Sequence, residues 1–557
     1  MGTMNVRVRG HTLPGPHGSA AATALASLAR SPLDGYVRLA ARYGDTVAVP
    51  YAPGQYFYLL SRPEHAEHVL AANQDNYVKA VTYRPLRALM GDGLLTSEGE
   101  RWRQHRRLVQ PVFSRRHVTT FGPVMTESAG RMIARWDSLA TGSVINVSGQ
   151  MGALALDIVG RALFGSDLSG ETEMMGRAMD AGQRVAVAAS FLPLRWGPTS
   201  TRALKTVARR VGHTSEGVEG PVSRIVSRRR AAGQPEPDPV SGAGAPPRGD
   251  LLDVLLAARA PDGSPLTDAE IADEVATFML AGHETTANTL SWSLALLSAH
   301  PAARERLEAE LDSVLGDRDP DTGDADKLPW TRAVVAEAMR LYPPAWTIER
   351  NALADDEMCG VQIPAGGLVA TPPYLVHRHP EFWADPAGFD PRRFLPDGEA
   401  PGLPHAAADR SPAADRSPAA DRSPAADRSP AADRNPAADR NPGADRSPGG
   451  GGDSAAGDSA ARDSAARDSA AGRDAAAGHG GEHHTGRPRH RYAYIPFGGG
   501  RRACVGASFA ELETVLVLAT VARRYRLELT VRGFPVPSAN ITMRPGRRLP
   551  MRLLRRG

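Results

Sequence analysis

A long apolar stretch from Thr267 to about Ala299 constrains the fold more than any other part of the sequence. It opens on Thr-Asp-Ala-Glu, the pattern of a helix capping box, and it meets no proline before Pro301. It is much longer than an ordinary helix of about 11 or 12 residues. An apolar helix of this length must cross the whole core.

The middle of this helix carries residues that interrupt its apolar surface. Gly282 lowers helix propensity by about 1 kcal/mol relative to alanine, and Glu284 and Thr285 follow it. A locally loosened helix with an acid and a hydroxyl turned inward suits proton delivery to a buried reactive centre. The alternative is a kinked core helix whose threonines bond back to the previous turn. A zinc-protease motif is excluded, because its second histidine position holds Ala287.

The segment Phe497 to Gly506 reads FGGGRRACVG and holds Cys504, one of only two cysteines. The other, Cys359, is far away in sequence, and the two form no disulfide or zinc pattern. A strongly helical segment follows Cys504, so a thiolate there would lie at a helix N-terminus, which stabilises negative charge. The glycines, Gly498 and Gly506 included, leave room for a flat, bulky ligand.

Two further motifs have an ordinary and a functional interpretation. In EGERWRQHRRLV, Trp102 and Arg106 lie four residues apart on one helical face. They could belong to a solvated basic helix or face carboxylates on a buried cofactor.

Glu337 and Arg340 form an i,i+3 pair that is commonplace on surfaces, but Arg393 could join them in a buried, mutually satisfied triad.

A low-complexity segment interrupts the second half of the chain. The unit AADRSP or a close variant repeats from residue 407 to 448, and DSAA repeats continue to about Gly478. Such a segment buries too little apolar surface to offset chain entropy. The sequence therefore predicts a flexible N-terminal segment at 1–30, one domain at 31–398 and 491–557, and a disordered insertion at 399–490. The histidines at 479–490 are interpreted as solvated, with weak metal binding as the alternative.

Composition excludes several classes of protein. The net charge is only +4 for 557 residues, which argues against a nucleic-acid-binding surface. The N-terminus has no apolar run of about 18 residues, so no membrane span is expected. The two distant cysteines suit a reducing cytoplasm.

The order and spacing of these four motifs resemble the cytochrome P450 family along nearly the whole chain outside the insertion. The resemblance implies a mainly α fold with a small β lobe and a haem b between the central helix and the helix after the cysteine loop. Cys504 would be the axial iron ligand, with Phe497 packed beneath the sulfur and Gly498, Gly506 and Ala281 close to the haem. The resemblance assigns the haem propionates to Trp102, Arg106 and Arg502, with Arg350 as a fourth candidate. Arg392 departs from the family pattern, where glutamate is common, but Arg393 is retained.

The resemblance also implies a function. A P450 monooxygenase activates dioxygen, with Glu284 and Thr285 relaying protons, and hydroxylates a small hydrophobic substrate such as a terpene, fatty acid or polyketide intermediate. The sequence has no flavin or nicotinamide fingerprint, so electrons would come from a separate ferredoxin with its reductase, or from a flavodoxin, acting on a monomer. The basic residues that could attract such a carrier are Arg107, Arg115, Arg116 and Arg501.

Two other classes remain open at this point. One is a haem-thiolate enzyme that does not activate dioxygen, such as an isomerase, dehydratase or peroxygenase. The other is a non-catalytic haem or ligand-binding protein. The expected pocket wall comprises residues 79–96, 181–200, Ala281, Ala345 to Ile348 and Ile541 to Met543.

Overall fold

The structure is a computed structural model that describes residues 5–8, 11–166, parts of 181–207, 214–231, 249–259, 263–395, 490–546 and 548–556. Its helices are α1 (Ser19–Arg30), α2 (Pro32–Tyr43), α3 (Pro63–Glu67), α4 (Arg84–Met90), α5 (Gly99–Val109), α6 (Arg115–Val118), α7 (Gly122–Asp137), α8 (Val147–Phe164), α11 (Thr214–Ala231), α12 (Leu251–Ala257), α13 (Asp268–Ala299), α14 (Pro301–Leu315), α15 (Pro329–Leu341), α16 (Pro373–Val376) and α17 (Ala507–Arg524). Its strands are β1 (Asn5–Val8), β2 (His11–Pro14), β3 (Thr46–Ala52), β4 (Gln55–Leu60), β5 (Tyr77–Lys79), β6 (Val144–Asn146), β7 (Glu349–Ala352), β8 (Asp356–Met358), β9 (Val361–Ile363), β10 (Leu368–Ala370), β11 (Tyr525–Leu529), β12 (Ser538–Ala539), β13 (Met543–Arg544) and β14 (Pro550–Arg555). The mainly helical fold with a smaller β region is the one predicted.

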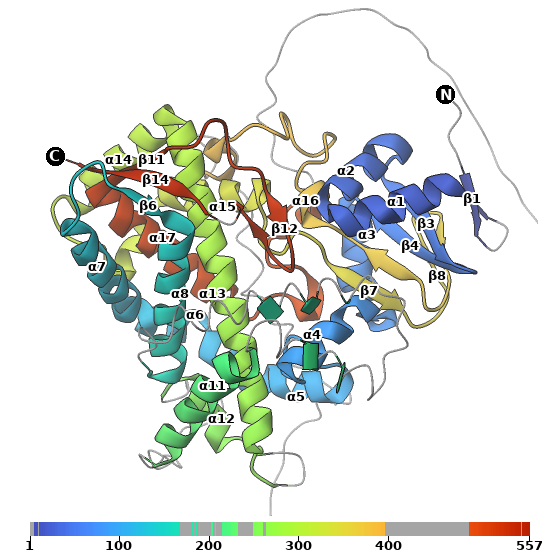
Figure 1. The fold of residues 1–557 in the computed structure, drawn as a ribbon, viewed down its shortest axis with the longest axis horizontal. Helices are drawn as coiled ribbons and strands as arrows, with labels where there is room; N and C mark the ends of the chain where they lie inside the picture. The colour runs from blue at the N-terminus through green and yellow to red at the C-terminus, as the bar shows by residue number, and fades with distance from the viewer. Residues whose placement is uncertain are drawn as a thin grey trace, which may run out of the picture. The chain divides into compact units, whose positions relative to one another are not determined.

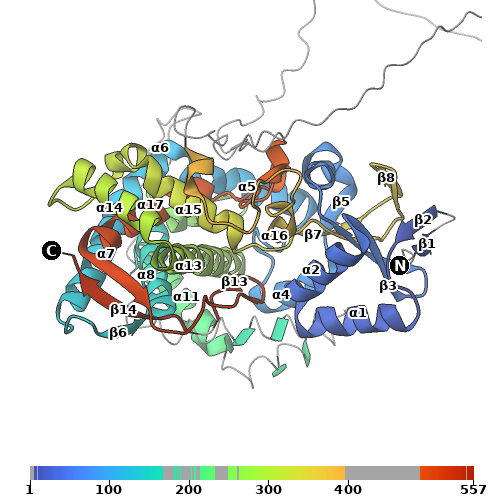
Figure 2. The same ribbon diagram turned by 90° about the horizontal axis from the view of Figure 1, so that it is seen from above.

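Helix α13 is the central element of the fold (Figure 1). Both halves of its predicted capping box form: the Thr267 hydroxyl accepts from the N–H of Glu270, and the Glu270 carboxylate accepts from the N–H of Thr267. The helix then runs for 32 residues. Seen along its axis, α13 is surrounded by α8, α15 and α17, which pack directly against it (Figure 2). Most of its side chains are therefore buried, as its apolar sequence requires.

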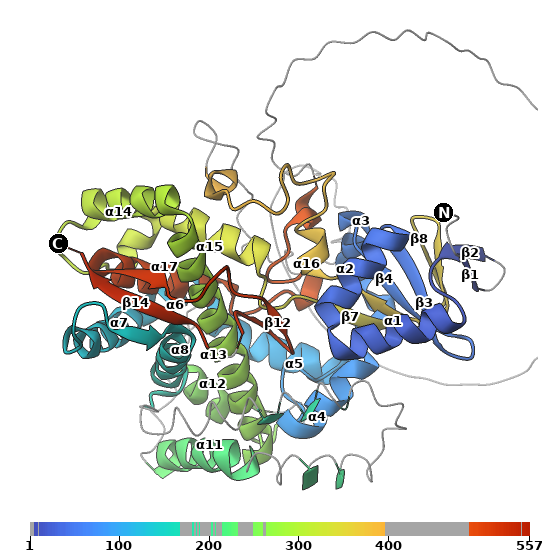
Figure 3. The same ribbon diagram turned by 45° about the horizontal axis from the view of Figure 1, so that its top comes forward.

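The main sheet has the strand order β3-β4-β10-β7-β5. Its first two strands form an antiparallel hairpin, and the chain turns at Gly54, whose φ of 69° suits glycine. Helices α1 and α2 pack against β3 beside this sheet (Figure 3). A three-stranded sheet, β11-β14-β6, lies near the C-terminus, and three two-stranded ribbons complete the described strands.

The N-terminal segment and the 79–96 region both contain regular structure. Residues 1–30 were expected to be flexible, but β1 pairs with β2 and α1 follows. Val8 and Leu28 explain the difference, because their side chains are buried and supply the apolar contact that a flexible segment lacks. The 79–96 region, part of the expected pocket wall, contains α4, which begins with proline in its first turn and ends at Gly91.

The predicted insertion lies almost entirely outside the described residues. The chain divides into two compact units, Met1–Asp409 with His484–Gly557, and Arg410–His483. All described elements belong to the first unit. Within the described part of the chain, no helix is both long enough and apolar enough to span a membrane.

Candidate active site

The Cys504 loop is closed by its own backbone and packed tightly against the β lobe. The N–H of Cys504 donates to the carbonyl of Phe497 at 2.8 Å. Gly500 has a φ of 65°, and a Cβ there would lie 1.7 Å from the carbonyl oxygen of Leu70. No other residue type fits at position 500. Phe497 is partly buried against the main core, and α17 begins at Ala507, three positions after the cysteine.

The surroundings of Cys504 act on its thiol in opposite directions. Its side chain is accessible to solvent, yet the surrounding protein raises the pKa of the thiol by burial. The backbone N–H of Gly506 and the Arg106 guanidinium act in the opposite direction, because both stabilise the thiolate. An exposed sulfur with thiolate-stabilising groups beside it is available to bind a ligand.

Arginines from three separate segments converge beside this loop. From α5, the Arg106 guanidinium donates to the carbonyl of Ala503 at 2.8 Å. Arg502 lies over the Trp102 ring, with its guanidinium carbon 4.2 Å from the ring centroid, and forms an ion pair with Glu98. Arg350, on β7, is only 8% exposed. A surface hollow is lined by Trp102, Arg350 and Arg502 together.

Lys79, which the sequence analysis missed, belongs to the same basic cluster. Its ammonium group donates to the carbonyls of Leu94 and Ser97 at 3.2 and 3.0 Å. Burial lowers its pKa to about 7, helped by the nearby Arg502 and Arg350 and opposed by Glu98. No local motif marks Lys79, because the groups that surround it come from distant parts of the chain.

The haem-free protein is expected to gain stability as the pH rises above 7, and Lys79→Met to lose that dependence. The pKa of Lys79 is about 7 in the folded chain against a usual value of 10.5. Between those values the unfolded chain binds more protons, so the free energy of unfolding rises by at most about 1.4 kcal/mol per pH unit. Denaturant titrations between pH 7 and 9.5 measure this slope. Equal slopes for the two proteins would contradict the assignment.

The middle of α13 presents an accessible face in an otherwise buried helix. Ala281 is exposed, although the neighbouring Leu280 and Glu284 are buried. The Thr285 hydroxyl donates to the carbonyl of Ala281 at 2.6 Å, which is the threonine back-bond considered from the sequence. Its oxygen lone pairs stay available to accept a proton. The Glu284 carboxylate forms an ion pair with Arg544 of β13, a partner that the sequence analysis did not identify.

Gly282 has a different role from the predicted loosening of the helix. Helix α13 continues through it without a break. A Cβ at this position would lie 2.9 Å from a methyl group of Val159, which is closer than side chains normally approach. Glycine therefore permits close packing between α13 and α8.

Gly282→Ala is expected to destabilise the protein by about 1–3 kcal/mol, the usual cost of overpacking, although alanine favours helix by about 1 kcal/mol. Adding Val159→Ala removes the clashing methyl groups, so the double variant should be more stable than the sum of the single effects predicts. Thermal unfolding of the four proteins gives the coupling free energy. An additive result would show that the contact with Val159 does not set the requirement for glycine.

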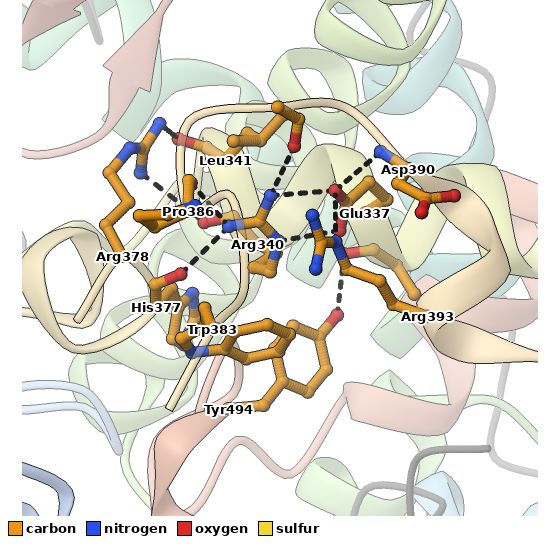
Figure 4. A network of polar contacts seen from close by, with 12 residues as sticks. Glu337, Arg340, Leu341, His377, Arg378, Trp383, Pro386, Asp390, Arg393 and Tyr494 are labelled. Carbon is orange, nitrogen blue, oxygen red and sulfur yellow. Dashed lines mark hydrogen bonds and ion pairs between the residues drawn. The ribbon is translucent and has the colours of Figure 1, made fainter. Parts of the chain in front are cut away.

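Glu337 and Arg340 form a fully buried ion pair with Arg393 beside it (Figure 4). The Arg340 guanidinium donates to both Glu337 carboxylate oxygens at 2.7 Å, and the Nε of Arg393 lies 3.4 Å from one of them. Burial raises the pKa of Glu337, and the hydrogen bonds from Arg340 oppose that rise. The remaining Arg340 hydrogen bonds reach the carbonyls of His377, Pro386 and Gly388. The α15 pair is thus part of the core and not a surface pair.

The chemistry of these groups fits a haem. An accessible cysteine sulfur with an N–H donor and a guanidinium nearby suits thiolate ligation of iron. Cationic side chains from β7, α5 and the cysteine loop suit two carboxylates. Lys79, which donates to the carbonyls of Leu94 and Ser97, adds one more cationic group to this cluster. Ala281 offers a small side chain on the accessible face of α13.

Comparison with known proteins gives one consistent result. The sequence model of the family described as Cytochrome P450 matches residues 20–408 and 482–548. Cytochrome P450 132 of Mycobacterium bovis is 30% identical over 506 residues, covering 88% of this chain and 86% of that protein. A cyclooctat-9-en-7-ol 5-monooxygenase of Streptomyces melanosporofaciens is 32% identical over 67% of this chain and 77% of its own. A pentalenene oxygenase of Streptomyces avermitilis is 33% identical over 64% of this chain and 75% of its own.

The fold has a solved counterpart as well. The crystal structure of the cytochrome P450DA heme domain superimposes with a TM-score of 0.69, covers 98% of both chains and is 22% identical in sequence. At that identity the likeness concerns the fold alone.

Proposed function

The chain belongs to the cytochrome P450 family and is a haem b monooxygenase, and from this premise we propose that it hydroxylates a compact, uncharged terpenoid. The observation that carries the proposal is an apolar cluster beside Ala281. It consists of Leu86, Leu280, Tyr83, Met90, Leu95 and Ile541. These residues come from α13, the α4 region and the β12–β13 turn, three parts of the expected pocket wall.

The composition of this cluster favours a hydrocarbon over the other substrates considered. None of its described members is charged, so it offers no cation to hold the carboxylate of a fatty acid. A polyketide intermediate carries several oxygens, which would need polar partners when buried. The names of two relatives specify a cyclic alkene and a cyclic alkenol as substrates, in agreement with a compact apolar ligand.

We assign the cofactor contacts as follows. Cys504 would ligate the iron, with Phe497 packed beneath it and Gly498 leaving room for the ring. When bound, the haem supplies an iron centre whose thiolate ligation favours cleavage of the O–O bond of dioxygen. The propionates would be held by Trp102, Arg106, Arg350 and Arg502, with Lys79 as an additional donor.

Glu284 and Thr285 are proposed to move protons. The back-bond to Ala281 fixes the Thr285 hydroxyl, so that its oxygen can accept a proton or order a water. Glu284 is buried and lies one residue away in sequence, which suits a general acid supplied from solvent. This pair would deliver protons where dioxygen is reduced and keep bulk water out of the pocket.

Electrons are proposed to come from a separate acidic carrier, because no flavin or nicotinamide motif occurs in the sequence. Three of the four basic candidates are exposed but paired: Arg107 with Glu100, Arg115 with Asp326 and Arg501 with Asp75. An acidic partner would have to compete with these surface acids, so association should weaken steeply with salt.

Spectroscopic titration tests the substrate assignment. Binding next to the iron displaces its water and shifts the spin state, so the Soret band reports occupancy directly. Pentalenene should give a larger shift at lower concentration than a fatty acid with the same number of carbons. Tighter binding of the fatty acid would overturn the terpenoid proposal without affecting the family assignment.

The segment 399–490 is proposed to be an insertion that haem binding does not need. The family model leaves residues 409–481 unmatched between its two matched parts. Deleting residues 407–478 should therefore preserve haem content, as measured by the pyridine haemochrome spectrum. Loss of haem from the shortened protein, with its helix content unchanged in circular dichroism, would contradict this.

A further inference from the structure

Two polar contacts attach the β12–β13 hairpin to one face of α13. Glu284 pairs with Arg544, and one turn later the side-chain amide of Asn288 donates to the hydroxyl of Thr542 at 3.2 Å. Residues four apart lie on the same face of a helix, so both contacts hold the hairpin from one side. Strand β13 lies beside α13, as seen along the helix axis (Figure 2).

The hairpin is also fixed from its other sides. The N–H of Met543 donates to the carbonyl of Pro344 at 3.0 Å. From the α13 side, the Trp292 indole, one turn beyond Asn288, adds a contact of 3.4 Å to the carbonyl of Met543. The Trp346 indole donates to the carbonyl of Asn540 at 2.8 Å. Arg544 therefore extends from a rigid support and not from a loose C-terminal loop.

The ion pair between Glu284 and Arg544 lies in a largely buried environment. Glu284 is 6% exposed, and the Arg544 side chain is 20% exposed. A carboxylate this deep in a protein is stable only when a cation or several donors face it. Arginine keeps its charge at all physiological pH values, so it can pair with the carboxylate and hold it in one orientation.

The same hairpin contributes Ile541 to the apolar cluster proposed above as the substrate-binding wall. Ile541, in the turn between β12 and β13, packs with Leu280 and Leu86 in the apolar cluster. Arg544 is three residues further on and contacts the acid one turn along α13 from Leu280. Ile541 of the proposed substrate-binding wall and Arg544, which pairs with Glu284, thus belong to the same short hairpin.

We propose that Arg544 is a positioning residue for proton delivery, which holds Glu284 between transfers and links its position to the substrate-bearing turn at Ile541. This rests on the role proposed above for Glu284. In each transfer the Glu284 carboxylate, held by Arg544, takes up a proton from solvent, passes it to Thr285 or a water, and returns as carboxylate to its pair with Arg544. None of these residues is oxidised or reduced in the transfer.

Infrared spectroscopy of the resting holoenzyme tests the proposal without turnover. Arg544→Gln leaves Glu284 buried without its guanidinium partner, so the carboxyl should take up a proton and show a protonated-carboxyl band. Arg544→Lys keeps the charge and should show no band. The band must also be absent from the double variant Arg544→Gln/Glu284→Gln. An Arg544→Gln spectrum without the band would overturn the proposal.

Dioxygen consumption, with electrons from a ferredoxin and its reductase, supplies a second readout. Arg544→Gln should slow proton-dependent turnover on the order of tenfold, and Arg544→Lys should recover most of the rate. In the background of Glu284→Gln the Arg544 substitution should have no further effect, because it acts through that carboxyl. Arg552→Gln, an exposed arginine on β14, is the matched control and should match the parent protein.

The two levels of the proposal fail in different ways. If Glu284→Gln leaves the rate and its solvent isotope effect unchanged, the proton role of Glu284 is wrong. If Glu284→Gln slows turnover but Arg544→Gln does not, only the role of Arg544 is wrong. Additive losses in the double variant would likewise show that Arg544 acts on the fold and not through Glu284.

Discussion

Cys504→Ser is expected to abolish the red-shifted Soret band of the ferrous–CO protein and to reduce oxygenation to background. A serine hydroxyl in this loop stays protonated and cannot supply the electron-rich ligand that a thiolate gives to iron. The substitution removes one sulfur and leaves the closing hydrogen bond from residue 504 to Phe497 in place, because that bond uses backbone atoms. The loop should therefore keep its conformation while the chemistry is lost.

Cys359→Ser is the matched control, since Cys359 is the other cysteine of the chain. It lies exposed between β8 and β9, outside the loop that carries Cys504. This variant should retain the Soret band, the haem content and the rate of the parent protein. A Cys504→Ser protein that kept the red-shifted band would remove the basis for assigning the axial ligand.

The structural features that can be predicted from sequence alone are those that depend on residues close together in the chain. The capping box at Thr267 and the glycine-lined loop around Cys504 each depend on residues within a few positions of one another. Their geometry follows from backbone sterics and hydrogen bonding, so a short pattern is sufficient. The pairing of Glu337 with Arg340 was also visible, because three residues along a helix bring side chains together.

The features that were missed depend on contacts between distant segments. Lys79 gains its unusual environment from Arg350 and Arg502, and Glu284 gains its partner from Arg544. No sequence pattern near Lys79 or Glu284 identifies these partners. Gly282 is a third case. Helix propensity alone suggested a loosened helix, whereas glycine is required there because Val159 on α8 leaves no room for a side chain.

Glu337→Gln is expected to cost about 3–5 kcal/mol of stability, the usual effect of breaking a buried ion pair by removing one partner. The amide keeps the shape of the side chain but leaves Arg340 as a buried cation without its counter-ion. Arg393 loses its acidic partner as well. Because a domain has only about 5–15 kcal/mol of net stability, much of the variant should fail to retain haem at 37 °C. Denaturant unfolding and haem content of the purified protein measure the two effects.

Arg392→Ala provides the surface comparison and should change stability by no more than about 0.5 kcal/mol, because its pair with Asp390 is solvent-exposed. A double variant, Glu337→Leu with Arg340→Met, separates the charge from the hydrogen bonds. Replacing a buried pair by apolar residues is often neutral. Here Arg340 also serves the carbonyls of His377, Pro386 and Gly388, which the double variant leaves without these donors. It should therefore be no more stable than Glu337→Gln, and full recovery would show that Arg340 serves only to neutralise Glu337.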